Sequence, residues 1–250
     1  MVQSQISLTV LKKVLIDSHP QRQQLLEIYG RLPQTRCRRQ AYCCALLPEM
    51  TLLEGLQILK KMEEMSVSQR TNLTKGIIQY FFINPAKITS CPFLRDRECL
   101  IYPSRPFGCR AYGLWSENYY EGLFEQSRQA KSFSQQQWQK LGVDLPKEVI
   151  EFQVPYCKWV QSDSRFPVND ASLLKAWDDI DALSEVLISG DHLFKNRYLS
   201  DLSFLLAALT FDDPKVLRLK FWVVQDMVNM GCSERLSGLI NQCFDLLGES

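Results

Sequence analysis

Histidine is scarce in this chain of 250 residues: only His19 and His192 occur, and neither stands inside a group of cysteines. A zinc site with mixed cysteine and histidine ligands is therefore not expected. An excess of charge of one sign is also missing, since 29 lysines and arginines face 28 aspartates and glutamates, for a net charge of +1. This balance gives no support to a nucleic-acid-binding or membrane-binding surface.

Long hydrophobic runs are missing as well. No window approaches the roughly 20 apolar residues that span a bilayer. The first residues, MVQSQISLTVLKKVLIDS, lack a basic segment before an apolar run and lack a cleavage site, so they indicate an amphipathic helix and not a signal peptide. We therefore expect a cytoplasmic protein, and in that compartment clustered cysteines more often bind metal or do redox chemistry than form disulfides.

Cysteine is the residue type that the chain does have, with nine in all. Seven fall in groups early in the chain: Cys37, Cys43, Cys44, Cys91, Cys99, Cys109 and Cys157. Thiolates are the soft ligands that zinc and iron–sulfur clusters select, so we predict that these seven bind one of the two. Several stand beside proline, glycine or arginine and outside any apolar period. The remaining two, Cys232 and Cys243, are interpreted as small buried hydrophobic residues.

The adjacent pair Cys43 and Cys44 limits the geometry of the predicted site. Neighbouring side chains diverge in most backbone conformations, so we expect one thiol to ligate while the other faces away or serves a second metal. The redox alternative is a vicinal disulfide, which would make the protein a thiol redox sensor. That alternative leaves the later cysteines unexplained.

Arginines flank the cysteines, which favours an anionic centre. Four thiolates on one zinc ion carry a net charge of −2, and an iron–sulfur cluster with its thiolates is also anionic. Nearby guanidinium groups lower thiol pKa values and hydrogen-bond the ligands. Arg105 and Arg110 alternate with Pro106, Phe107 and Cys109, and we predict that both contact the bound cofactor.

The apolar pattern predicts a mainly α-helical protein. The expected helices cover 5–31 with an interruption at His19–Pro20, then 51–65, 68–83, 117–141, a short helix after Pro146, 171–188, 199–210, 214–230 and 233–247. The spacing of Thr51 and Glu54 predicts a capping box at the start of the helix 51–65. Residues 87–113 differ, because they hold three prolines, three cysteines and a short apolar CLIY. They predict an irregular loop with a short hairpin, organised by the metal, in which CLIY forms a strand. The expected division is an N-terminal helical segment (1–34), a cysteine-cluster domain (35–160) and an all-helical C-terminal region (165–250).

At these cysteines the chain resembles the YkgJ-like cysteine-cluster family, a zinc- or iron-chelating domain. The family pattern runs C-x2-C-x2-C-C, C-P-x-L, C-x-I-Y-x-x-R-P-x-x-C-R and a late cysteine. It is matched here by Cys37 with Cys43–Cys44, by Cys91–Leu94, by Cys99–Arg110 and by Cys157. The resemblance covers about residues 35–160 and implies metal binding. The family's second cysteine falls at Gln40, so one thiolate is missing.

A further branch of similar proteins, the flagellin lysine methylases, implies an enzyme alternative. In that case an iron–sulfur-dependent protein would use S-adenosylmethionine to methylate protein lysines. The chain shows no G-x-G-x-x-G after a strand and no P-loop, so this alternative rests on the resemblance alone. The expected partners are the metal or cluster and, through the C-terminal helices, another protein. The missing thiolate at Gln40 would decide between a closed centre and an open, reactive one.

Overall fold

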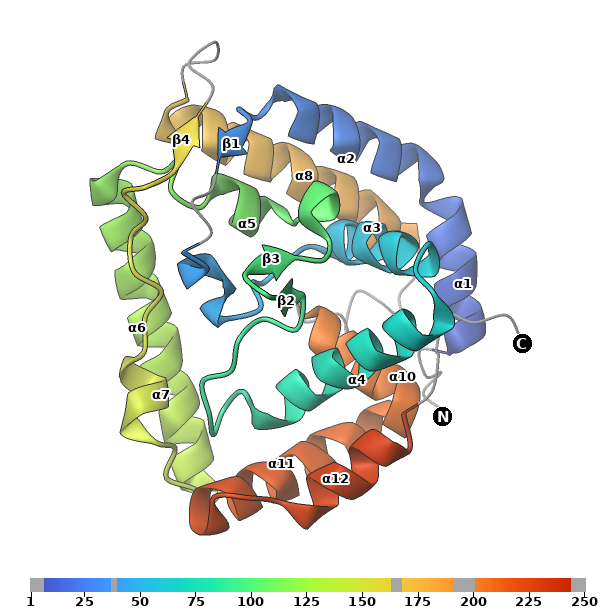
Figure 1. Ribbon diagram of the computed structural model, residues 1–250, viewed down its shortest axis with the longest axis vertical. Coiled ribbons are helices and arrows are strands. Elements are labelled where there is room, and N and C mark those ends of the chain that lie inside the picture. The colour runs from blue at the N-terminus through green and yellow to red at the C-terminus, as the bar shows by residue number, and fades with distance from the viewer. Residues whose placement is uncertain (1–6, 37–39, 163–167, 191–200, 244–250) are drawn as a thin grey trace.

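The computed structural model describes residues 7–36, 40–162, 168–190 and 201–243, and in these ranges the protein is mainly helical, as predicted (Figure 1). The α-helices are α1 (Leu8–Asp17), α2 (His19–Arg31), α3 (Leu52–Glu63), α4 (Val67–Ile83), α5 (Phe107–Ala111), α6 (Glu117–Lys140), α7 (Lys147–Glu151), α8 (Asp170–Gly190), α10 (Leu202–Phe211), α11 (Asp213–Met230) and α12 (Glu234–Asn241). The short 3-10 helices are η1 (Tyr42–Ala45) and η2 (Tyr102–Ser104). None of the described helices is long and apolar enough to cross a membrane.

Local capping explains where several helices begin and end. The capping box predicted at Thr51 and Glu54 is present at the start of α3, with each side chain bonded to the other residue's backbone N–H. Ser66 and Gln69 form a second box at α4. At the C-terminal end of α11, Gly231 takes a left-handed φ of 74°, a conformation that ends a helix and that glycine adopts at low cost.

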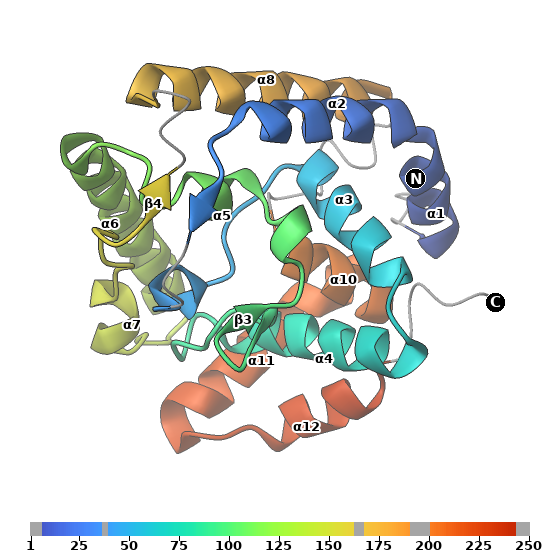
Figure 2. The ribbon, with the colours of Figure 1, turned by 45° about the horizontal axis from the view of Figure 1, so that its top comes forward.

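Two large hydrophobic cores hold the helices together. The first packs α4 against α10, α11 and α12, and it also takes in α1 and α3. The second lies among α2, α3, α8 and the short α5. Figures 1 and 2 show α2 and α8 running side by side along one edge, with α11 and α12 at the opposite edge. Segments from the beginning, middle and end of the chain therefore share the same cores.

Within the described ranges there are four strands, each two residues long, and they form two antiparallel pairs. β1 (Thr35–Arg36) pairs with β4 (Gln161–Ser162), so the two ends of the predicted cysteine-cluster domain meet. β2 (Leu94–Arg95) pairs with β3 (Glu98–Cys99), which confirms the predicted hairpin. The expected strand over CLIY is wrong beyond Cys99, because Tyr102–Ser104 turns into η2 with Pro103 in its first turn.

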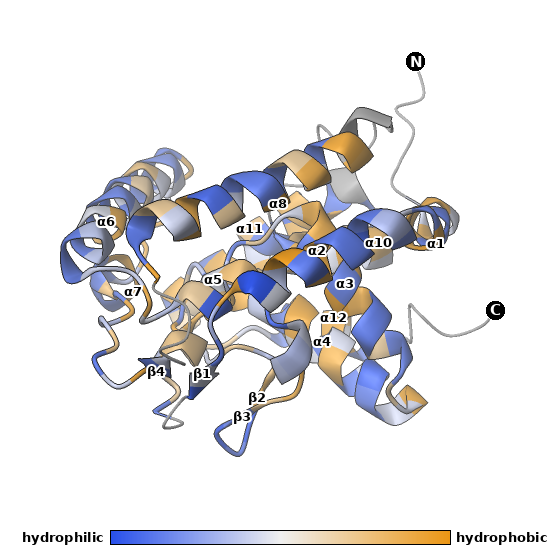
Figure 3. Ribbon diagram, turned by 90° about the horizontal axis from the view of Figure 1, so that it is seen from above, coloured by the Kyte–Doolittle hydropathy of each residue, from blue (hydrophilic) through white to orange (hydrophobic). Residues whose placement is uncertain are grey.

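Helix α6 differs from the others because none of its residues is buried. Figure 3 shows it largely hydrophilic and set at one side of the molecule. Its start is held by Ser116, whose N–H and hydroxyl donate to the Asp170 carboxylate, at 2.8 and 2.5 Å. Near its end, Trp138 stacks on Phe221 of α11 with ring centroids 6.3 Å apart. The helix is thus tied to the rest of the molecule near both ends, and in its middle Lys131 donates to carbonyls of Val149 in α7 and of Phe152.

Candidate metal centre

Five of the seven predicted cysteine ligands line one pocket of about 490 Å³. They are Cys43, Cys44, Cys91, Cys99 and Cys109. They come from η1, from the hairpin segment and from α5, elements that lie together near the centre of the view in Figure 1. Residues as far as 66 positions apart are therefore brought to one cavity by the fold, where Cys43 and Cys109 share a wall.

Backbone hydrogen bonds fix the segments that carry these thiols. The Cys91 N–H donates to the Cys44 carbonyl at 2.7 Å, which joins the first cysteine group to the second. The Phe93 N–H donates to the Cys91 sulfur, and the Ile101 N–H donates to the Cys99 sulfur. Each donor lies two residues after its cysteine, so the turn that follows each thiol points an amide at it. Such amide–sulfur bonds stabilise thiolates in metal sites.

The adjacent thiols of Cys43 and Cys44 do not diverge. Their sulfur atoms lie 3.8 Å apart and both face the pocket, because η1 bends the backbone tightly there. The expectation that one of the two would face away is therefore wrong. Sulfurs bound at about 2.3 Å to one tetrahedral zinc ion also lie about 3.8 Å apart, so the pair can share an ion.

The pKa values of four thiols in the pocket are raised: those of Cys43, Cys91, Cys99 and Cys109. The hydrogen bond with Cys44, followed by burial, raises the pKa of Cys43. Burial raises the pKa of Cys91 to about 12 and also raises the pKa of Cys99. For Cys109 the pKa is raised by burial and then by repulsion from the neighbouring thiolates. These four thiols are therefore uncharged at neutral pH when no cation is bound.

Arg105 is the arginine closest to this chemistry. It lines the pocket, and its positive charge lowers the pKa of Cys43, Cys99 and Cys109 against the larger effects that raise them. Its guanidinium lies 3.8 Å from the centroid of the Tyr102 ring. Contact with the Tyr102 ring therefore holds the Arg105 cation beside the thiols.

Arg110 lies elsewhere, outside the pocket lining. Its Nε donates to the Arg105 carbonyl at 2.8 Å and its Nη2 donates to the Pro103 carbonyl at 2.5 Å. The guanidinium also lies 4.0 Å from the centroid of the Tyr29 ring. Arg110 therefore braces the backbone that carries Arg105, and the structure shows no contact between its side chain and the pocket.

Glu54 supports the segment that carries Cys109, a role that the capping-box pattern in the sequence does not predict. Its side chain is buried, and Oε1 accepts from the Tyr29 hydroxyl at 2.6 Å and from the Phe107 N–H at 2.5 Å. Oε2 accepts from the N–H and the hydroxyl of Thr51. The carboxylate thus connects α2 and α3 to the first residue of α5, the helix that carries Cys109.

Cys157 is buried outside the pocket lining, beside Gly113. Gly113 has a φ of 79°, and a Cβ there would stand 2.6 Å from Val160 and 3.3 Å from the Cβ of Cys157. Only glycine allows this close approach. Burial raises the pKa of Tyr120 to about 12, and the nearby Cys43 and Cys157 raise it by smaller amounts.

The other predicted positions fall in different places. Cys37 lies outside the described residues, as do Arg38 and Arg39. Gln40, where the family pattern has a cysteine, is exposed and does not line the pocket. Cys243 is buried as predicted, but Cys232 is exposed, so its interpretation as a core residue was wrong. Cys232 precedes the N-cap of α12, where the chain turns at the surface.

The thiols surround the cavity without converging on one point. In the described ranges, no three side chains of cysteine, histidine, aspartate or glutamate are placed to hold an ion as they stand. No protein-family model, curated protein or solved structure matches this chain. The resemblance to the cysteine-cluster family therefore stays a prediction, and the candidate site stands on its geometry.

Proposed function

We propose that the pocket of Cys43, Cys44, Cys91, Cys99 and Cys109 holds a thiolate-bound metal centre. The supporting observation is that three separate chain segments bring five thiols to one cavity. A soft donor set of this kind, without histidine, suits zinc or an iron–sulfur cluster. Binding a cation there would favour the thiolates over the neutral thiols and release protons.

The size of the cavity favours an iron–sulfur cluster over a single zinc ion. A volume of about 490 Å³ greatly exceeds the share of about 30 Å³ that one water molecule takes in the liquid. A closed zinc site needs four donors at about 2.0–2.3 Å from one point. Donors spread around a larger space match a cluster whose several iron atoms each take a thiolate.

Metal analysis of protein purified without oxygen tests this proposal. We expect stoichiometric iron and sulfide with a broad visible absorption band. Cys91→Ser and Cys109→Ser should each lose most of the metal, because each removes a thiol from the pocket wall. The matched control is Cys232→Ser, which removes an exposed thiol and should leave the metal content unchanged.

Three results distinguish the alternatives. Stoichiometric zinc without visible absorption would keep the metal centre and reject the cluster. Metal-free protein with the same fold would overturn the proposal. In that case the 3.8 Å separation of the Cys43 and Cys44 sulfurs favours the thiol redox sensor, in which a two-electron oxidant would join the two sulfurs with loss of two protons.

Other predictions belong to the same proposal. A cytoplasmic location fits free thiols, because reducing compartments preserve them. A protein partner at the C-terminal helices could use the exposed side chains of Leu217, Trp222 and Met230. The methyltransferase alternative, with S-adenosylmethionine as donor, continues to rest on the resemblance and on no contact described above.

A further inference from the structure

A second, larger cavity lies on the other side of the cysteine wall. It measures about 880 Å³, within the range of small-molecule sites. Cys43 and Cys109 line both cavities, so these two thiols separate the candidate metal centre from the larger space. We call this space the α6 cleft, because one side of it is formed by Leu123, Gln126, Ser127, Ala130, Lys131, Ser134 and Trp138 of that helix.

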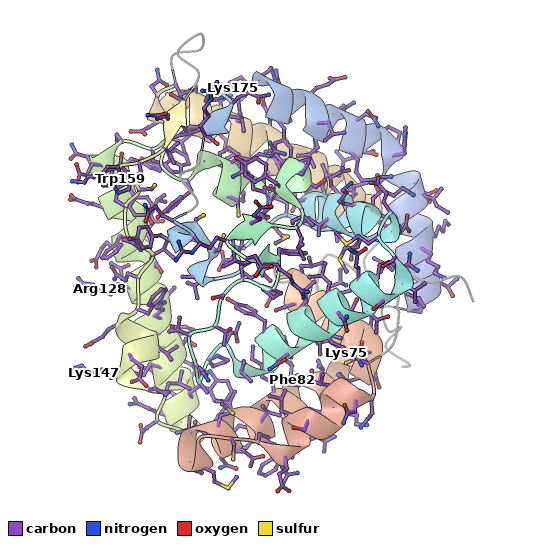
Figure 4. The ribbon with its side chains drawn as sticks, in the orientation of Figure 1. Lys75, Phe82, Arg128, Lys147, Trp159 and Lys175 are labelled. Carbon is purple, nitrogen blue, oxygen red and sulfur yellow. The ribbon has the colours of Figure 1, made fainter. Side chains whose placement is uncertain are left out.

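Leu123 and Trp138 of α6 pack against hydrophobic clusters, and between them the helix faces the cleft. Ser127, Ala130 and Ser134 are small and exposed, although they lie on the side of the helix that lines the cavity. Figure 4 shows the labelled Arg128 of α6 and Lys147 of α7 pointing to the outside of the molecule. The small side chains of Ser127, Ala130 and Ser134 leave room for a ligand beneath the helix.

The walls of the cleft are rich in aromatic rings. Tyr112 and Trp115 line it from the segment between α5 and α6, Tyr120 from the start of α6, and Trp138 from near the end of α6. The hydroxyl of Tyr120 donates to the Val154 carbonyl at 2.8 Å, which leaves the ring face to the cavity wall. Aromatic walls of this kind bury the flat or extended apolar body of a ligand.

Two polar groups give the cleft a chemical preference. The Oδ1 of Asn84 is buried in the cleft wall and has no hydrogen-bond partner within the described protein. The Nζ of Lys220, partly buried, lies 4.0 Å from the centroid of the Phe81 ring, and no carboxylate of the described residues forms a salt bridge with it. Asp201 raises the pKa of Lys220 but does not reach salt-bridge distance, so a bound anion would supply this ammonium with a direct counter-ion.

The balance of charge in the cleft also favours the binding of an anion. Lys131 and Lys220 both line it, whereas Glu49 is the one carboxylate among the described lining residues and is exposed. Lys131 already donates to the carbonyls of Val149 and Phe152, so Lys220 is the cation with free hydrogen-bonding capacity. Trp138 of the cleft wall is held in place by stacking on Phe221 of α11.

We propose that the α6 cleft binds an amphipathic organic anion, with its acidic group at Lys220 and its aromatic or aliphatic body along the rings of Tyr112, Tyr120 and Trp138. Such a ligand would lie against the Cys43 and Cys109 wall. The binding itself requires no metal, so this site can exist whether or not the proposed function holds.

A pair of fluorescent probes of similar shape tests the proposal on the full chain. 8-Anilinonaphthalene-1-sulfonate carries an anionic group, and N-phenyl-1-naphthylamine lacks it. We expect saturable binding of one sulfonate probe per chain. Lys220→Gln should weaken that binding about tenfold, the loss expected for one charged contact, and change the neutral probe by less than about twofold. Lys215→Gln, an exposed lysine of the same helix, is the control.

A filling variant locates the site. Ala130→Trp places a large side chain in the cleft from an exposed helical position and should reduce the binding of both probes. Equal loss of the sulfonate probe in the Lys215 and Lys220 variants would overturn the proposal, and so would unchanged binding in Ala130→Trp. Repeating the titration with metal-free protein keeps this result separate from the metal analysis, because the cleft should bind in either state.

Discussion

At the scale of single residues, Glu54 supports the geometry of the cysteine pocket. Its two oxygens accept four hydrogen bonds, from Tyr29, Thr51 and Phe107. In Glu54→Gln the amide nitrogen cannot accept, so buried donors lose their partner, and each such loss costs about 1–3 kcal/mol. We expect urea unfolding to show a destabilisation of this size, together with faster alkylation of Cys109, whose helix begins at Phe107.

Glu64→Gln provides the comparison for this residue. Glu64 lies at the C-cap of the same helix and pairs at the surface with Lys61, at 2.6 Å. Exposed ion pairs of this kind contribute about 0–1 kcal/mol, so its loss should leave both the unfolding curve and the alkylation rate nearly unchanged. Equal destabilisation by the two variants would show that Glu54 has no special role.

Glu54 also shows how far the sequence could predict the site. The spacing of Thr51 and Glu54 predicts a capping box, because that interaction is local. The bonds to Tyr29 and Phe107 cross 25 and 53 residues, and they exist only because α2, α3 and α5 pack together. The cysteine positions were predicted from their residue type and motif, but their meeting in one pocket is a property of the fold.

At the scale of secondary-structure elements, the β2–β3 hairpin contains local strain. Asp96 and Arg97 connect the strands with φ values of 50° and 64°, both left-handed. This conformation costs a non-glycine residue about 1–2 kcal/mol, and glycine is preferred in two-residue hairpin turns. Arg97→Gly should therefore stabilise the metal-free protein by about 1 kcal/mol in urea unfolding, after the entropy lost by glycine is counted.

Arg95→Gly is the matched variant in the same hairpin. Arg95 is also exposed, but it lies in β2 and is not among the left-handed residues. Glycine in an extended strand costs about 0.5–1 kcal/mol, so this change should destabilise the protein. Opposite signs for the two arginines would confirm the turn geometry, and the same sign for both would contradict it.

The sequence predicted that hairpin but placed its second strand too far along the chain. An apolar run such as CLIY has strand propensity, yet Leu100 and Tyr102 are exposed here and the chain turns at Ile101. Ile101 is buried in the main core instead. A short apolar run does not tell whether its residues alternate across a sheet or fold back into a core, and the packing of α4 and α10 decides it.

At the scale of the whole molecule, Lys220 lies where several parts meet. It belongs to α11, stands over Phe81 of α4, is influenced by Asp201 at the start of α10, and lines the α6 cleft. Burial lowers the pKa of Lys220 to about 8, and Asp201 raises it by a smaller amount. The unfolded chain has a lysine pKa of about 10.4. Between these values the unfolded state binds more protons than the folded state.

Protein stability should therefore depend on pH through Lys220 in a defined direction. The cost of its buried charge is fully present below pH 8 and disappears as the pH rises towards about 10.4, because the folded lysine then becomes neutral first. Lys220→Met removes this cost, so the variant should exceed the wild type in stability at pH 7 by about 1 kcal/mol, discounted for partial exposure. Its advantage should shrink by pH 10. Urea unfolding of both proteins at the two pH values measures the difference, in which the titration of the cysteines cancels.

Lys215→Met, from the exposed face of α11, should show no such change. A difference between Lys220→Met and wild type that stays constant with pH would mean that the ammonium is solvated in the cleft, and its need for a bound anion would then be lost.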